Sequence, residues 1–165
     1  MIDQPPGPLG SGTPEDPRLV VESWMAIPGP DGWRLLVLRR TPQSGGFWQG
    51  VSGRVEAFDR SLRAAALREI REETGLDADI EIVDLELWTT FRGPMSGATF
   101  RKRSLAAILP PTVTAASIRL SDEHDAAEIL TIADARRRLR FRPNQEELDA
   151  LERLLAARGP AAARG

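Results

Sequence analysis

Three glutamates, Glu69, Glu72 and Glu73, stand three and four residues apart in a stretch whose composition favours a helix. At 100° per residue, this spacing places all three carboxylates on one helical face. Like charges at this spacing repel and cost a few tenths of a kcal/mol per pair, unless a cation lies between them. Carboxylate oxygens are the ligands that Mg²⁺ and Mn²⁺ prefer. The spacing therefore predicts a site for Mg²⁺ or Mn²⁺.

The neighbouring residues predict where this helix begins and ends. Ser61 is a favourable N-cap, the residues after it are rich in Ala, Leu, Arg and Glu, and Gly75 supplies a C-terminal stop. The carboxylates should flank a buried stripe made of Ala66, Leu67, Ile70 and Thr74. Taken alone, such a helix is usually a solvated surface helix, here with an Arg68–Glu72 pair.

The order of residues in 53–76 resembles the Nudix box. That pattern is Gly, five residues, Glu, seven residues, then Arg-Glu-hydrophobic-x-Glu-Glu-x-Gly-hydrophobic, and its positions are filled here by Gly53, Arg68, Glu69, Ile70, Glu72, Glu73, Gly75 and Leu76. So many fixed positions in one window are far more specific than a lone glycine loop. There are two departures: Asp59 replaces the first Glu, and eight residues separate it from Arg68. The extra residue falls in the loop of residues 56–60.

The resemblance implies hydrolysis of a nucleoside diphosphate linked to another group, by attack of water on phosphorus. It implies that Glu72 and Glu73 bind metal and that Glu69 is a further ligand or a base. Arg68 would orient the carboxylates by charge-assisted hydrogen bonds. The backbone carbonyl of Ser52, next to a glycine that permits close approach, would complete the metal ligands.

Nudix enzymes often take a further carboxylate from a late loop, and residues 121–125 are acidic. Glu123 is our candidate there, as a metal ligand or the general base. A solvated acidic loop is an equally weighted alternative. His124, the only histidine, fits a structural role better than a catalytic one.

Residues 47–56 are similar to a segment of the bacterial dihydroneopterin triphosphate pyrophosphatases, and Glu123-His124 matches their late Glu-His pair. The Trp expected after that pair is missing, with Ile129 near its place. A pterin triphosphate is therefore a candidate substrate beside nucleotides.

A flat substrate ring could stack on Trp48 or Phe91, and Arg39 could contact phosphate. Trp48 could equally belong to the core, because aromatic residues at strand ends are commonly buried. The basic residues 101–103 could also contact phosphate, although a solvated strand edge is the simpler interpretation.

Composition narrows the class of protein. The chain has 165 residues, of which 41% are hydrophobic and 28% charged, as expected for one globular domain. A net charge of −2 gives no electrostatic reason to bind nucleic acid. No apolar run reaches the ~20 residues of a membrane helix, so we expect a cytoplasmic protein that binds no membrane. The absence of cysteine excludes disulfides and thiolate catalysis. The oligomeric state cannot be derived from these features.

The remaining pattern predicts an α/β protein of the α+β type, which the resemblance specifies as a Nudix α-β-α sandwich with a mixed β-sheet. Residues 18–157 should form the domain, between flexible tails of residues 1–17 and 158–165. Strands are expected at residues 18–27, 33–40, 47–52, 80–91 (with a bulge near Val83), 99–109 and 126–130, and further helices at 132–139 and 144–157.

A second class of function is a non-catalytic module that senses nucleotides or binds partners on a Nudix scaffold. The change at Asp59 and the extra loop residue motivate it. The complete Arg-Glu-x-x-Glu-Glu order disfavours it, because a sensor has no chemical need for a full metal cluster.

Overall fold

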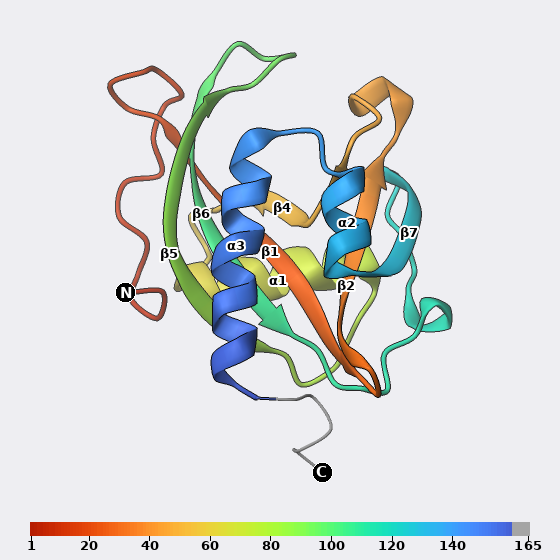
Figure 1. Cartoon of the computed structure of the whole chain (residues 1–165). Helices are drawn as coiled ribbons and strands as arrows, with labels where there is room; N and C mark the ends of the chain where they lie inside the picture. Colours follow the sequence, from red (N-terminus) through yellow and green to blue (C-terminus); the bar gives the residue numbers. More distant parts are fainter. Residues whose placement is uncertain (160–165) are drawn as a thin grey trace.

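The computed structural model describes residues 1–159 as a sheet with helices on both faces (Figure 1). Within these residues the strands are β1 (Arg18–Gly29), β2 (Gly32–Arg40), β3 (Trp48–Gln49), β4 (Val51–Arg54), β5 (Glu81–Arg92), β6 (Thr99–Ile108) and β7 (His124–Thr131). The helices are α1 (Leu62–Thr74), α2 (Ile132–Arg138) and α3 (Arg142–Ala157), with short 3-10 turns at Pro42–Ser44 and Ala115–Ser117.

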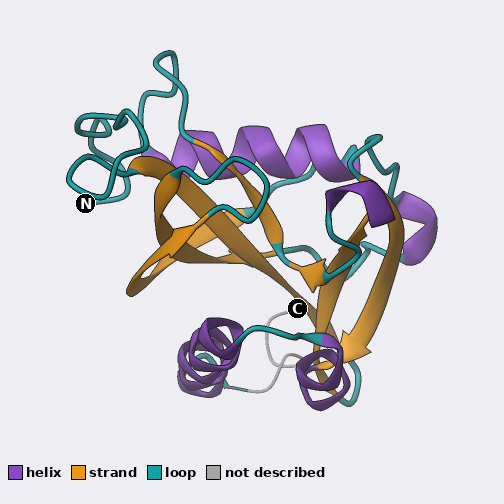
Figure 2. Ribbon diagram, turned by 90° about the horizontal axis from the view of Figure 1, so that it is seen from above, coloured by secondary structure: helices purple, strands orange, loops and turns teal. Residues whose placement is uncertain are grey.

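The sheet is mixed, as predicted. Its central order is β3-β2-β1-β6-β5, with β4 paired to β1 and β7 paired to β2. Only the β1–β6 pair is parallel among the described strands. Helix α1 covers one face, and α2 and α3 cover the other (Figure 2). The predicted α-β-α sandwich is thereby confirmed.

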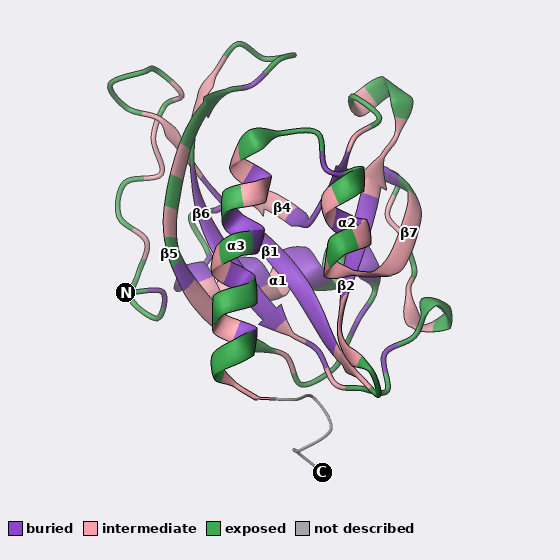
Figure 3. Ribbon diagram, in the orientation of Figure 1, coloured by how far each residue is buried: buried purple, intermediate pink, exposed green. Residues whose placement is uncertain are grey.

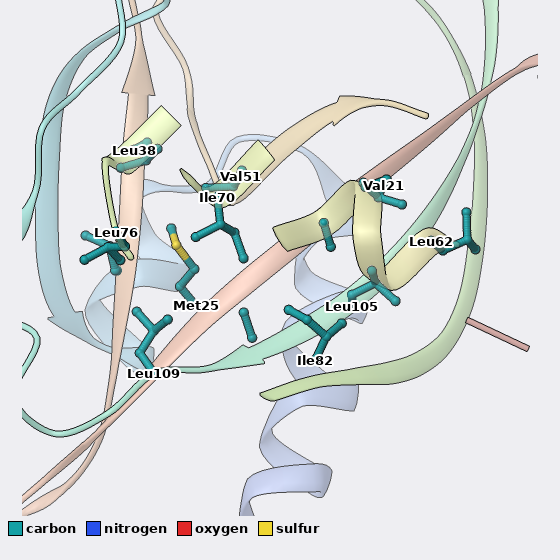
Figure 4. Close-up of a cluster of buried hydrophobic side chains, with 14 of the residues drawn as sticks. Val21, Met25, Leu38, Val51, Leu62, Ile70, Leu76, Ile82, Leu105 and Leu109 are labelled. Atoms are coloured by element: carbon teal, nitrogen blue, oxygen red, sulfur yellow. The ribbon is translucent and has the colours of Figure 1, made fainter. Parts of the chain in front are cut away.

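Each face of the sheet has its own hydrophobic core, because side chains alternate along a strand. On β1, Val21 and Met25 pack toward α1, where they meet Ile70 (Figure 4). Trp24 points to the other face and packs with Leu151 of α3. The central strands are consequently buried on both sides, whereas the outer face of α3 is exposed (Figure 3).

The box helix has the predicted ends. The Oγ of Ser61 accepts a hydrogen bond from the Ala64 N–H at 3.0 Å, and Gly75 ends α1 in the left-handed conformation with φ 67°. The buried stripe differs from the prediction: Leu67 is only half-buried, while Glu69 and Glu73 are themselves buried. Two of the three carboxylates therefore lie at the edge of the core.

Two local details refine the sequence analysis. The bulge predicted near Val83 is present directly after it, between Asp84 and Leu87, where Glu86 has φ 58° and its N–H donates to the Asp84 carboxylate. This side-chain hydrogen bond supports the left-handed conformation. Helix α3 begins at Arg142, two residues early, because proline is favourable in a first helical turn.

Residues 1–17 form no helix or strand, but they contact the domain. Ile2 is buried in the core beneath α1, its carbonyl accepts from the Arg63 N–H at 3.0 Å, and Asp3 pairs with the Arg63 guanidinium. The predicted flexibility of this segment stays a prediction. Of the predicted C-terminal tail, residues 160–165 lie outside the described residues. No helix within residues 1–159 is long and apolar enough to cross a membrane.

A buried ionic cluster joins the sheet to α3. The ammonium of Lys102 on β6 contacts the carboxylates of Glu22 on β1 and Glu147 on α3, the latter at 2.7 Å. Burial lowers the pKa of Lys102, but the two carboxylates outweigh it and leave this pKa above its ordinary value. Glu147 also accepts from the Trp24 indole N–H at 2.9 Å and from the Ser104 hydroxyl at 3.0 Å. Lys102, Glu22 and Glu147 are called the buried triad below.

Candidate active site

The centre of the site is the place where β4 meets α1. A Cβ atom added to Gly53 would lie 1.9 Å from the carboxyl carbon of Glu69. Only glycine therefore fits at position 53 as long as the Glu69 side chain stays where it is. The close approach brings the backbone of β4 directly against a carboxylate of α1.

This junction opens into a cleft of about 550 Å³. Its centre is lined by Ser52, Gly53, Arg68, Glu69, Glu72 and Glu73; the β2–β3 region adds Arg40, Phe47 and Gln49, the β5–β6 hairpin adds Phe91, Met95 and Phe100, and Glu123 comes from the loop before β7. In Figure 1 the β2–β3 and β5–β6 loops extend beyond the start of α3 at the top of the view. Regular elements hold the carboxylates, and loops form the walls.

Arg68 connects the carboxylates to the loop before α1. Its Nε and Nη2 donate to both oxygens of Asp59, at 3.0 and 2.8 Å, and Nη2 also donates to the Arg54 carbonyl at 2.8 Å. Its Nη1 donates to Glu69 at 2.6 Å and to Glu72 at 3.3 Å. Asp59, which departs from the box pattern, is thus the bidentate anchor of the arginine.

The pKa values of two acidic groups are shifted in opposite directions. Burial raises the pKa of Glu69 to about 7, although the hydrogen bond from Arg68 opposes this shift. Burial also acts to raise the pKa of Asp59, but the hydrogen bonds from Arg68 and from the Glu56 N–H outweigh it and lower this pKa. Asp59 therefore stays ionised as a partner for the guanidinium.

Glu73 is held by residues that precede or begin β7. Its Oε2 lies 2.8 Å from Nδ1 of His124 and also accepts a hydrogen bond from the Ser121 hydroxyl. These two hydrogen bonds outweigh burial and leave the pKa of Glu73 below its ordinary value. The other ring nitrogen of His124, Nε2, lies 3.2 Å from the side-chain nitrogen of Gln49.

The donor set at the centre suits a hard divalent cation. Among residues 1–159, one oxygen each of Glu69, Glu72 and Glu73 makes the hydrogen bonds described above, and the second oxygen of each makes none. No group of three or more His, Asp or Glu side chains in that range is arranged to hold an ion as it stands. Ion binding would therefore require these side chains to turn inward, toward the oxygen geometry that Mg²⁺ demands.

Two other predicted residues line the cleft. Glu123 is exposed at its edge and pairs with Arg40 at 3.3 Å. Phe91 is 40% exposed and stacks on Phe100, with ring centroids 5.4 Å apart and planes 22° apart. An exposed aromatic face at a polar cleft is suited to stacking with a planar ring.

Arg39 and Trp48, predicted to bind substrate, are not among the residues that line the cleft. They are directly paired across β2 and β3, on the side of the sheet that packs toward α2 and α3. Trp48 is buried there, and Arg39 pairs with Asp125 at 2.7 Å. Their neighbours Arg40 and Gln49 line the cleft instead, because consecutive side chains of a strand alternate between faces.

Residues 101–103 are also not among the residues that line the cleft, and their strand, β6, lies between β1 and β5 and is not an edge. Lys102 belongs to the buried triad, and Arg103 is buried and bonded to Asp84 at 2.5 and 2.8 Å. Arg101 lies over the Trp88 ring at 4.2 Å. The sequence analysis also missed Phe100, which only the register of the β5–β6 hairpin brings opposite Phe91.

A family model and several solved structures match this chain. The model of the NUDIX domain matches residues 23–151. A Nudix hydrolase of Listeria monocytogenes has a TM-score of 0.69 at 24% identity, over 82% of this chain and 93% of that one. An Ap4A hydrolase of C. elegans scores 0.69 at 18% identity, over 84% and 98% of the two chains. The E. coli dihydroneopterin triphosphate pyrophosphohydrolase scores 0.64 at 20% identity, over 84% and 95%. At these identities the three structures show a shared fold.

A curated relative is closer in sequence but longer. A protein of Myxococcus xanthus named octanoyltransferase is 38% identical over 120 residues, which are 72% of this chain and 32% of that protein. The chain thus spans about a third of the length of this relative. We therefore carry no acyl-transfer activity over to it.

Proposed function

We propose that this chain, which belongs to the Nudix family, is a metal-dependent pyrophosphohydrolase. Its substrate would be a nucleotide or a nucleotide-like compound. The family comprises hydrolases of nucleoside diphosphate derivatives. One observation carries the proposal: three carboxylates of α1 line one cleft beside the backbone of Gly53, and each keeps an oxygen that no hydrogen bond occupies within residues 1–159.

The residues that line the cleft would have different roles in binding the metal ion and the phosphates. Glu72 and Glu73 would hold Mg²⁺ or Mn²⁺, with Glu69 as a further ligand or the base; the Ser52 carbonyl and Glu123 would complete the shell. When bound, such an ion neutralises phosphate oxygens and lowers the pKa of water. Arg68 keeps the carboxylates in place, and Arg40 offers a positive charge to the phosphate chain.

The walls of the cleft support a substrate with a flat ring. Phe91 presents an aromatic face at one wall, and its stacking with Phe100 holds that face in place. A nucleobase or a pterin would stack there, with the phosphates toward Glu69 and Glu72. The proposed partners are therefore small pyrophosphates, with no nucleic acid or membrane, and the proposed location is the cytoplasm.

The sensor alternative loses its main motivation in the geometry. Asp59 makes a bidentate contact to Arg68 and so retains the part that orients the carboxylates. Binding of nucleotide in a calorimeter without turnover is the result that would favour a sensor.

The decisive experiment is a substrate panel. The purified protein is mixed with deoxynucleoside triphosphates, dihydroneopterin triphosphate, ADP-ribose and dinucleoside polyphosphates, each with Mg²⁺ or Mn²⁺, and release of phosphate or pyrophosphate is followed. We expect turnover of at least one compound, and a loss of roughly 100-fold or more in Glu72→Gln, because that variant lacks a metal-binding charge.

The matched control is Glu146→Gln, which removes the same charge from an exposed position of α3. It should turn over like the parent protein. The proposal fails if no compound is hydrolysed, or if Glu72→Gln is as active as Glu146→Gln.

A further inference from the structure

His124 lies in a buried position between two groups that each fix one of its ring nitrogens. It is the first residue of β7 and is 5% exposed. On one side Nδ1 lies 2.8 Å from Oε2 of Glu73, and on the other Nε2 lies 3.2 Å from the side-chain nitrogen of Gln49. Gln49 comes from β3, so the histidine links β3 and β7 to α1.

The two neighbours select one form of the imidazole ring. A carboxylate oxygen only accepts hydrogen bonds, so Nδ1 must carry the hydrogen. The amide nitrogen of Gln49 only donates, so Nε2 must be the bare, accepting nitrogen. The two contacts therefore place a hydrogen on Nδ1, toward Glu73.

This arrangement determines which oxygen of Glu73 remains available. Oε2 accepts from both His124 and Ser121, whereas Oε1 accepts no hydrogen bond within residues 1–159. Glu73 lines the cleft. A carboxylate held through one oxygen leaves the other to bind a cation, which is how second-layer hydrogen bonds usually orient a metal ligand.

We propose that His124 is a positioning residue: Gln49 holds the ring in place, and the Nδ1 atom of the ring fixes Glu73 for metal binding. This inference rests on the proposed function, because it takes Glu73 to be a metal ligand. It replaces the two roles considered from sequence, a passive core histidine and a direct catalyst.

The first test needs no variant, because the chain has a single histidine. In ¹⁵N-labelled protein at neutral pH, freed of any histidine tag, long-range ¹⁵N–¹H correlation spectra report which ring nitrogen carries hydrogen. We expect hydrogen on Nδ1. A ring that carries hydrogen on Nε2 alone overturns the inference.

The second test compares two amides at position 124. Asparagine can place its N–H where Nδ1 lies, whereas glutamine reaches the place of Nε2. His124→Gln should weaken Mn²⁺ binding, measured by electron paramagnetic resonance, by about tenfold or more, as for other residues that orient metal ligands. His124→Asn should stay closer to the parent protein. Asp122→Asn, an exposed change in the same loop, is the control.

The outcomes separate this inference from the proposed function. If the parent protein binds Mn²⁺ but His124→Gln binds it as tightly as His124→Asn does, the inference alone fails. If the parent binds no Mn²⁺, the metal-dependent function fails, and the role assigned to His124 fails with it. Excess Mn²⁺ should restore turnover of His124→Gln toward the parent rate with little change in substrate KM; a mere folding defect would give no such recovery.

Discussion

The contact between Asp59 and Arg68 explains the two departures from the Nudix box. Aspartate is one methylene shorter than the glutamate of the pattern, and the loop before α1 is one residue longer. We infer that the longer loop brings the shorter side chain to the guanidinium, where both oxygens bind at 3.0 and 2.8 Å. With both changes present, Asp59 thus still makes a bidentate contact to Arg68.

Removing the anchor should affect both stability and activity. Asp59→Ala leaves a largely buried guanidinium without its bidentate partner, which should lower the free energy of unfolding by about 3 kcal/mol. Urea unfolding at neutral pH measures this loss, and hydrolysis should fall as Glu69 and Glu72 lose their orientation. An unchanged urea midpoint would show that Asp59 does not anchor Arg68.

The same residue predicts part of the acid sensitivity of the fold. The pKa of Asp59 in the folded protein lies below its ordinary value of 3.8, so the unfolded chain binds the proton first as pH falls. The stabilisation is full above about pH 4 and is lost as the pH drops through the folded pKa. Urea unfolding between pH 6 and pH 3 should show a steeper loss in the parent than in Asp59→Asn. Equal slopes would contradict the prediction.

At the scale of elements, the site depends on how closely β4 approaches α1. The Cβ of an alanine at position 53 would overlap the end of the Glu69 side chain, which can swing away, and not the backbone. The cost should therefore fall on the chemistry and not on the fold.

Gly53→Ala should unfold at nearly the parent temperature but hydrolyse its substrate about 100-fold more slowly, because a displacement of ~1 Å is enough for such a loss. Thermal unfolding and steady-state kinetics measure the two effects. Gly7→Ala, where an added Cβ meets nothing within 4 Å, should leave both unchanged. Full activity of Gly53→Ala would mean that Glu69 has no fixed place in the reaction.

The elements also show what sequence could predict. Helix α1 was predicted with its caps because Ser61 and Gly75 act locally, and the carboxylates followed from helical spacing. That Arg39 and Trp48 lie away from the cleft could not be predicted, because alternation along a strand does not say which face meets the cleft. Phe100 and Gln49 escaped notice because their roles depend on strand register and on a histidine from a distant strand.

At the scale of the whole molecule, the buried triad fastens α3 to the middle of the sheet. Lys102, Glu22 and Glu147 come from three different elements, and all three are buried. The local sequence does not predict this cluster, because Lys102 lies in a basic run that is typical of a solvated strand edge.

Lys102→Met should destabilise the protein by about 3–5 kcal/mol, because it leaves two buried carboxylates without a cation. Combining it with Glu22→Gln removes one of the uncompensated charges and should recover part of the loss. Urea unfolding of the single and double variants measures both effects. If the single variant matches the parent, the triad contributes nothing to stability.

Lys102 is also the only lysine of the sequence, and 6% of it is exposed. An acylating ester added to the native protein consequently finds no side-chain amine on the surface. Its reaction with Lys102 awaits the rare molecules in which the sheet and α3 have come apart. The slow gain of mass at this one residue, followed by spectrometry over hours, would therefore serve as a clock for global opening under conditions where no denaturant is present.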